Sequence, residues 1–170
     1  MHPALPYNEK LYNQAERALK FFTRSWAQGD MTDDERLAVG KAYQKRLEAI
    51  NLPSPVGDLA ALNPHDGYIL DVAYEPIATI LRLRLRCGDL QVGYFDAFLN
   101  FSGVTIQPDH LGMLIEARRP ADFEVLYDEV DRNEADTFEY RLLLHPSFEV
   151  AFQFKGIVIS QQPTGNRRTV

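Results

Sequence analysis

The sequence predicts an α+β fold, in which an N-terminal antiparallel helical hairpin precedes an antiparallel β-meander of about six strands. Apolar residues recur every three or four positions between residues 8 and 50, as amphipathic helices require. Proline and glycine interrupt residues 51–66, and from Tyr68 onward apolar residues alternate with a period of two. No helix is predicted between successive strands, which argues against a parallel sheet. We therefore expect one strongly curved sheet, or a half-barrel closed by the helices.

The first predicted helix spans residues 8–28 and gathers its apolar side chains on one stripe. Gly29 follows it and is suited to a left-handed C-cap. The second predicted helix covers residues 33–50. Thr32 and Glu35 at its start fit a capping box, in which each side chain accepts a hydrogen bond from the other residue's backbone. The short turn between these two helices predicts that they run antiparallel.

The second half of the chain reads as consecutive strands joined by turns. The predicted strands cover residues 68–75, 79–86, 90–101, 123–130, 137–145 and 149–160. Cys87, Gly88 and Asp89 are expected to form the turn between the second and third of them. Residues 104–122 fit either a helical turn or a strand, because Pro108 and Pro120 limit both.

Length and composition predict a single domain. The chain has 170 residues, of which 45% are hydrophobic and 25% charged, as in ordinary globular proteins. We expect the domain to span residues 1–162, with 51–66 as connector between its halves and 163–170 as a flexible tail. The single cysteine excludes an internal disulfide. Without an apolar run of membrane-spanning length or a signal-peptide pattern, the expected location is the cytoplasm.

Charge argues against a nucleic acid as the main partner. The chain carries 18 Lys+Arg against 24 Asp+Glu, and its net charge is −6 at pH 7. An acidic run is the candidate partner-binding surface, since it would attract a basic protein: Asp128, Glu129, Asp131, Glu134 and Asp136. A solvated strand end and loop would explain the same run equally well.

Three arginines form a second candidate site. Arg82, Arg84 and Arg86 alternate with leucines, so a strand would place their guanidinium groups on one face, about 7 Å apart. That spacing suits anionic groups. The alternative is a solvated face whose arginines pair with acidic residues of neighbouring strands, such as Asp71, Asp96 or Glu139.

The sequence contains no motif that predicts catalysis. His65 and Asp66 are adjacent, as in some metal-dependent hydrolases, but they lie in a turn without further ligands at helical spacing. A purely local role in that turn explains them as well. Cys87 has no base near it in sequence. The other histidines, His2, His110 and His145, lack metal-ligand spacing. We therefore predict no catalytic residue, metal site or cofactor, and a protein that is not an enzyme.

Four short segments resemble a known class of domains. They are Asn63–Ile69, Leu81–Leu85, Leu99–Val104 and Leu126–Val130. The β half in which they lie, residues 63–160, resembles uncharacterised bacterial β-meander domains that are similar to immunity proteins of polymorphic toxin systems. The resemblance implies a non-catalytic protein that neutralises a cognate antibacterial toxin by occluding its active site.

Two other functions stay open at this point. The arginine face predicts a module that binds a small anionic ligand, and His65 with Asp66 indicates a metal-assisted hydrolase. An exposed edge of the meander also predicts a homodimer, since such an edge can pair with a second copy of itself.

Overall fold

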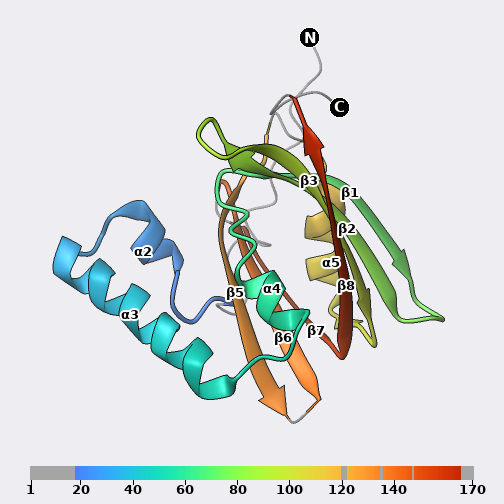
Figure 1. Ribbon diagram of the computed structural model, residues 1–170, viewed down its shortest axis with the longest axis horizontal. Helices are drawn as coiled ribbons and strands as arrows, with labels where there is room; N and C mark the ends of the chain where they lie inside the picture. The colour runs from blue at the N-terminus through green and yellow to red at the C-terminus, as the bar shows by residue number, and fades with distance from the viewer. Residues whose placement is uncertain (1–17, 120–121, 135, 147, 166–170) are drawn as a thin grey trace.

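The computed structural model describes residues 18–119, 122–134, 136–146 and 148–165, which form two four-stranded antiparallel sheets (Figure 1). Sheet 1 has the strand order β1-β2-β3-β8, and sheet 2 has the order β4-β7-β6-β5. The strands are β1 (Tyr68–Glu75), β2 (Ile80–Asp89), β3 (Gly93–Ser102), β4 (Thr105–Ile106), β5 (Val125–Glu134), β6 (Thr137–Leu144), β7 (Phe148–Phe154) and β8 (Gly156–Thr164). The helices are α2 (Arg24–Gln28), α3 (Asp33–Ile50), α4 (Val56–Ala60) and α5 (Pro108–Glu116). The α+β composition is as predicted, but the arrangement differs in two ways.

The predicted helical hairpin is wrong. In the part of residues 8–28 that the structure describes, residues 18–23 are not helical, and α2 has only five residues. The backbone N–H groups just before α2 bond to carboxylates of sheet 2 instead of helical carbonyls, so tertiary contacts override the helical pattern. Residues 8–17 lie outside the described residues. The left-handed C-cap at Gly29, helix α3 and its capping box, formed by Thr32 and Glu35, match the prediction.

The predicted single meander is also wrong. The strand expected over residues 149–160 is two strands, since β7 ends at Phe154 and β8 begins at Gly156. β7 pairs with β6 in sheet 2, whereas β8 pairs with β3 in sheet 1. The buried positions change phase at this point, from Val150, Phe152 and Phe154 in β7 to Ile157 in β8, and Val158 is 67% exposed. The undecided residues 104–122 contain β4 and α5, with Pro108 in the first turn of that helix.

The hydrophobic core lies between the inner faces of the two sheets. Phe101 of sheet 1 contacts Phe152, Phe154 and Tyr140 of sheet 2, with ring centroids 4.9, 5.0 and 5.9 Å apart. α4 contacts the edge strands β5 and β8, and α5 contacts β7 and β1, so each short helix bridges the two sheets. Within the described ranges, no helix is both long and apolar enough to cross a membrane.

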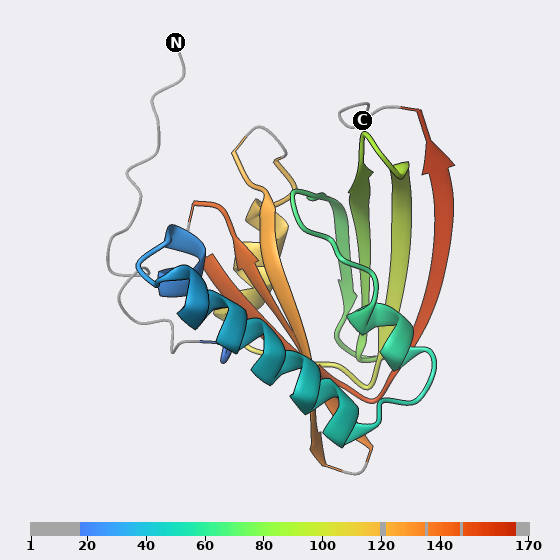
Figure 2. The ribbon, with the colours of Figure 1, turned by 60° about the vertical axis from the view of Figure 1, so that its left-hand side comes forward.

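The outer faces of the two sheets differ. α3 lies beside β5 on the outer side of sheet 2 (Figure 2). No described helix lies on the outer side of sheet 1, where alternate side chains of β1, β2 and β8 are exposed. We call the outer face of sheet 2 the covered face and the outer face of sheet 1 the open face.

Candidate functional site

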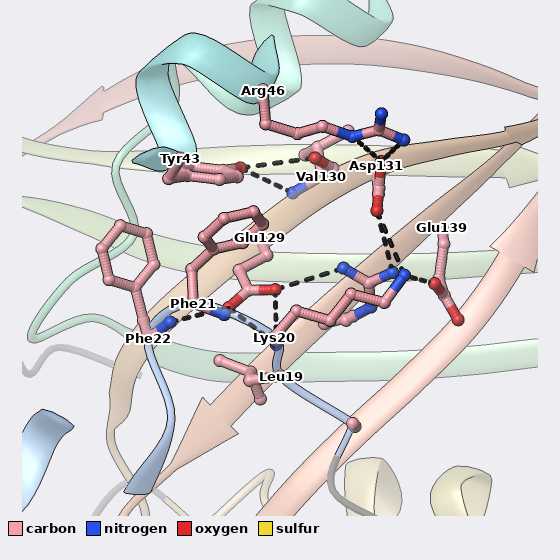
Figure 3. A network of polar contacts seen from close by, with 12 residues as sticks. Leu19, Lys20, Phe21, Phe22, Tyr43, Arg46, Glu129, Val130, Asp131 and Glu139 are labelled. Atoms are coloured by element: carbon pink, nitrogen blue, oxygen red, sulfur yellow. Dashed lines mark hydrogen bonds and ion pairs between the residues drawn. The ribbon is translucent and has the colours of Figure 1, made fainter. Parts of the chain in front are cut away.

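A buried arginine, Arg141, organises the covered face, and Figure 3 shows the carboxylates with which it pairs, those of Glu129, Asp131 and Glu139. Arg141 is 1% exposed and pairs with three carboxylates. Its guanidinium nitrogens lie 3.2 Å from Glu129 and 3.2 Å from Asp131, and it also bonds to Glu139. Glu129 and Asp131 are themselves buried. Such a cluster is stable only while every member is paired, because an isolated buried charge is costly.

Strand register brings these charges together. Glu129 lies directly opposite Arg141 in the β5–β6 ladder, and Asp131 lies opposite Glu139. Residues two apart on a strand share a face, so all four side chains lie on the outer side of sheet 2. The residues between them, including Val130 and the Tyr140 opposite it, belong to the hydrophobic core.

An extended segment, residues 18–22, crosses the covered face and is held there through its backbone. One carboxylate oxygen of Glu129 accepts hydrogen bonds from the N–H groups of Phe21 and Phe22, at 2.7 and 2.8 Å, and the carboxylate also accepts from Lys20 N–H. Glu149 of β7 accepts from the N–H groups of Ala18 and Leu19. Backbone donors and Arg141 together therefore compensate the buried carboxylates.

Helix α3 closes the network at β5. Arg46 donates two hydrogen bonds to Asp131, at 2.9 and 2.8 Å. Burial disfavours the charged form of Asp131, but hydrogen bonds from Arg46, the Arg132 backbone and Arg141 outweigh it and hold the pKa at about 2. The Tyr43 hydroxyl accepts from Val130 N–H at 2.8 Å and lies 3.5 Å from the Val130 carbonyl. One helix thus neutralises a buried charge and bonds to the backbone of an edge strand.

A polar groove of about 480 Å³ lies beside this network. Lys20, Glu139, Arg141, Gln107, His110 and Gln153 contribute to its lining. Lys20 lies 3.3 Å from Asp131, and Arg141 is fully engaged with carboxylates, so the charges at the groove are paired within the protein. Because its cationic and anionic side chains already pair with one another, the groove favours neither an anionic nor a cationic ligand.

The structure does not present the predicted acidic run as one surface. Glu129 and Asp131 are buried in the Arg141 network, whereas Glu134 and Asp136 are exposed around the β5–β6 turn. Asp128 points to the opposite side of β5, since its cross-strand neighbour Leu142 belongs to the core. The run alternates between the two faces of a strand, so its members do not form a common docking site.

Asp128 lies at the rim of the core near Tyr140 and Cys87, and burial raises its pKa to about 7. Cys87 lies in β2 and not in the predicted turn, which residues 90–92 form instead. Burial also raises the pKa of the Cys87 thiol, to about 12. A thiol with that pKa has a negligible thiolate fraction at neutral pH, so the geometry gives no activated nucleophile.

The three predicted arginines do share one face, the open face of sheet 1, and each has an acidic partner. Arg82 pairs with Glu75 of β1, and Arg84 and Arg86 share Asp96 of β3. Burial of Asp96 opposes ionisation, but hydrogen bonds from Arg86 and Arg84 outweigh it and lower the pKa. This arrangement matches the alternative in which the arginines pair across strands, with Asp96 the partner that the sequence correctly suggested.

Aromatic and aliphatic side chains lie among these pairs. Phe98 is opposite Arg84 in the β2–β3 ladder, and the Arg84 guanidinium lies 5.4 Å from its ring centroid. Val158 of β8 is opposite Asn100, two positions along β3 from Phe98. Phe98 is 36% exposed and Val158 is 67% exposed. The open face therefore combines an exposed apolar pair with a stacked guanidinium.

The predicted pair of His65 and Asp66 contacts β5. His65 stacks on Tyr127 with ring centroids 4.8 Å apart, and its Nδ1 bonds to the Leu126 carbonyl. Asp66 lies 3.5 Å from His65 Nε2. Among the residues that the structure describes, no three histidine, cysteine or acidic side chains gather as metal ligands.

Sequence reasoning missed the centre of the covered face. Arg141 and Glu149 were not singled out, although Glu139 and Arg141 alternate with Tyr140 and Leu142 in a predicted strand. Such alternation predicts a shared face, but it does not indicate that the charged face is buried.

Comparisons with known proteins add no family to this description. No protein-family model, curated protein or solved structure matches the chain. The likeness to immunity-protein domains is therefore a prediction from short segments, and function has to be argued from the geometry.

Proposed function

We propose that this chain is a non-catalytic binding protein that docks a protein partner on the open face of sheet 1. The observation that carries the proposal is the distribution of exposed apolar residues. In the described part of the chain, two of them, Phe98 and Val158, lie on the open face, and three more lie in the turns at the two ends of β2: Ile77, Leu90 and Val92. Exposed apolar side chains among polar ones are a feature of protein interaction sites.

The partner we propose is a basic antibacterial toxin domain, which the chain neutralises in the cytoplasm by covering the toxin's active site. The net charge of −6 supports long-range electrostatic steering of a basic protein before the two surfaces come into contact. On the open face, Phe98 and Val158 then supply apolar contact, and Arg84 supplies a stacked guanidinium, a group enriched in interface hot spots.

The geometry favours this function over the two alternatives. Each arginine of the open face has a carboxylate partner, so a small anion would have to displace Glu75 or Asp96. His65 packs on an aromatic ring, and among the residues that the structure describes only Asp66 is an acidic neighbour within ion-pair distance. Neither observation supports a ligand or metal site.

Affinity capture with matched variants tests the proposal. The wild-type protein, Phe98→Glu with Val158→Glu, and the control Leu37→Glu are each tagged and used to capture proteins from lysate of the native cells. Leu37 is 58% exposed on α3, away from the open face. We expect one stoichiometric protein with the wild type and the control, and its loss with the Phe98/Val158 variant.

Expression of the captured partner in cells then distinguishes simple binding from neutralisation of a toxin. Expressed alone it should arrest growth, and co-expression with the wild-type chain should restore growth, whereas co-expression with the Phe98/Val158 variant should not. Absence of any stoichiometric partner, or equal capture by all three proteins, would overturn docking on the open face. A partner that is harmless when expressed alone would overturn the immunity function and leave binding intact.

A further inference from the structure

The edge strands of the two sheets are protected to different extents. In sheet 2, the Tyr43 hydroxyl bonds to the backbone of Val130 at the outer edge of β5. On the other side of sheet 2, His110 of α5 lies with Nδ1 3.2 Å from the Ala151 nitrogen and 2.9 Å from its carbonyl oxygen. Side chains from helices thus occupy backbone groups that another strand would otherwise pair with.

In sheet 1, β1 and β8 are the edge strands. α5 packs against β1, and Gly67 just before β1 bridges to Val125 of sheet 2. β8 lies at the far edge of the sheet (Figure 2). Among the described residues, the backbone hydrogen bonds of β8 go to β3 alone. α4 contacts β8, but Ser160 to Pro163 are exposed regardless of the face to which their side chains point.

The composition of β8 is unusual for a free edge. Its nine residues, Gly156–Thr164, include no charged side chain. Natural edge strands are commonly protected by lysine, by other charges or by proline, and here only Pro163 near the end has that effect. Among the residues that the structure describes, no side-chain hydrogen bond from a helix caps β8, and no charge in the strand would prevent pairing along Val158–Gln162.

We propose that β8 pairs antiparallel with β8 of a second copy of this chain, joining two copies of sheet 1 into one continuous sheet. Around the two-fold axis of such a dimer, equivalent side chains lie opposite or nearly opposite one another. A charged residue would then face its own copy and repel it, whereas β8 offers Ser160, Gln161 and Gln162, which can hydrogen-bond to their own kind. This self-compatibility favours a second copy over an unrelated strand.

The interface would be small, because it consists mainly of one strand from each copy. Such an area is below that of permanent dimers, so the association should depend strongly on protein concentration. The dimer does not rest on the proposed function: Phe98 lies on β3, so Phe98→Glu alone should leave dimerisation intact, whereas Val158→Glu alters β8 itself and does not separate docking from dimerisation.

Sedimentation-velocity ultracentrifugation over a wide concentration range tests the dimer. The wild-type protein should shift from the monomer mass toward the dimer mass as concentration rises. Ser160→Lys places two like charges near the two-fold axis and should abolish the shift. Asn100→Lys adds the same charge to the same face, one strand away from the edge, and should behave as wild type. Circular dichroism of each variant confirms that it is folded.

Three results would overturn the proposal. The wild-type protein could stay monomeric at the highest concentration, or folded Ser160→Lys could dimerise as wild type does. Loss of dimerisation in both lysine variants would also overturn it, because that result would point to contact between open faces. Partner capture that survives in a monomeric Ser160→Lys variant would separate this dimer from the proposed docking function.

Discussion

The outer charge pair of the open face and the central pair of the covered face lie in opposite environments, although Arg86 and Asp96 of the open face are buried, at 3% and 6% exposed. On the open face, Arg82 pairs with Glu75, and both side chains are about half exposed, at 48% and 51%. On the covered face, Arg141 and Glu129 are 1% and 0% exposed. Exposed pairs contribute little to stability, because water and salt screen them. Removing one partner of a buried pair leaves the other charge buried without compensation, which strongly destabilises the fold. The same kind of ion pair therefore affects the free energy of unfolding more when it is buried than when it is exposed.

This difference separates a face that holds the fold together from one that is available for binding. The covered face binds residues 18–22 and α3, both far from sheet 2 in sequence. On the open face, the pairs of Arg82, Arg84 and Arg86 join adjacent strands and not distant segments. Substitutions on the covered face should therefore change stability, and those at exposed positions of the open face, such as Phe98 and Val158, should change binding.

Removal of Arg141 should give the largest loss of stability. Arg141→Ala leaves Glu129, buried on the covered face, without its cationic partner. We expect the free energy of unfolding in urea to fall by about 3–5 kcal/mol. Arg82→Ala is the control and should change it by no more than about 1 kcal/mol. Equal losses in the two variants would contradict the distinction between the faces.

Glu149 tests how residues 18–22 are held. Glu149→Gln keeps the size of the side chain but replaces a charged acceptor of the Ala18 and Leu19 N–H groups with a neutral one. We expect a loss of about 1.5–3 kcal/mol in unfolding free energy, as for hydrogen bonds to charged groups. Hydrogen exchange at the Leu19 amide should accelerate, while exchange in β3 should accelerate by no more than the loss of unfolding free energy accounts for. Unchanged exchange at Leu19 would show that Glu149 does not anchor the segment.

The sequence predicted structure correctly where the interacting residues are close in sequence, and it failed where they are far apart. The capping box of α3 and the shared face of Arg82, Arg84 and Arg86 were predicted correctly, because each depends on residues a few positions apart. Residues 18–22 have an apolar spacing that fits a helix, but Glu129, more than 100 positions away, binds their backbone. No local pattern contains that partner.

The candidate site shows the same limit. The sequence predicted one acidic surface that included Asp128, Glu129 and Asp131. Side chains alternate along β5, however, so Asp128 lies on the core side and the other two lie on the covered face. Whether a charged strand face is exposed depends on what packs on it, which here is α3 and residues 18–22. Likewise, the break at Lys155 that divides the two sheets shifts the buried positions by one residue, and the apolar run Ile157–Ile159 does not indicate which of its residues are buried.

The two sides of β5 should respond to pH in opposite directions. Asp128 has a pKa of about 7 in the folded protein and about 4 when unfolded, so its burial costs stability as pH rises through this window. Asp131, with a folded pKa of about 2, stabilises the fold above pH 4, and this contribution is lost as pH falls through about 4 to 2.

Asp128→Asn tests this difference. The variant carries no charge at the rim of the core, so we expect it to be more stable than wild type by about 1–2 kcal/mol near pH 8, with the gain shrinking toward pH 4. Urea unfolding at several pH values measures it. Asp136→Asn, at an exposed position of the β5–β6 turn, is the control for simple loss of negative charge. A gain that is equal in both variants, or that grows as pH falls, would contradict a raised pKa at Asp128.

The smallest effect is expected at the contact between α3 and the edge of sheet 2. Tyr43→Phe removes the hydroxyl that accepts from Val130 N–H but keeps the ring, which packs 5.0 Å from Phe22. One hydrogen bond of this kind contributes about 1 kcal/mol, so urea unfolding should show a loss of that size. Tyr94→Phe is the control, since none of its described contacts is a hydrogen bond from its hydroxyl, and its stability should match wild type.

Tyr43 also blocks the edge of β5, so Tyr43→Phe tests edge protection as well. The variant could show a new association that depends on protein concentration. If adding Ser160→Lys does not suppress that association, β5 without its cap pairs in the way proposed for β8.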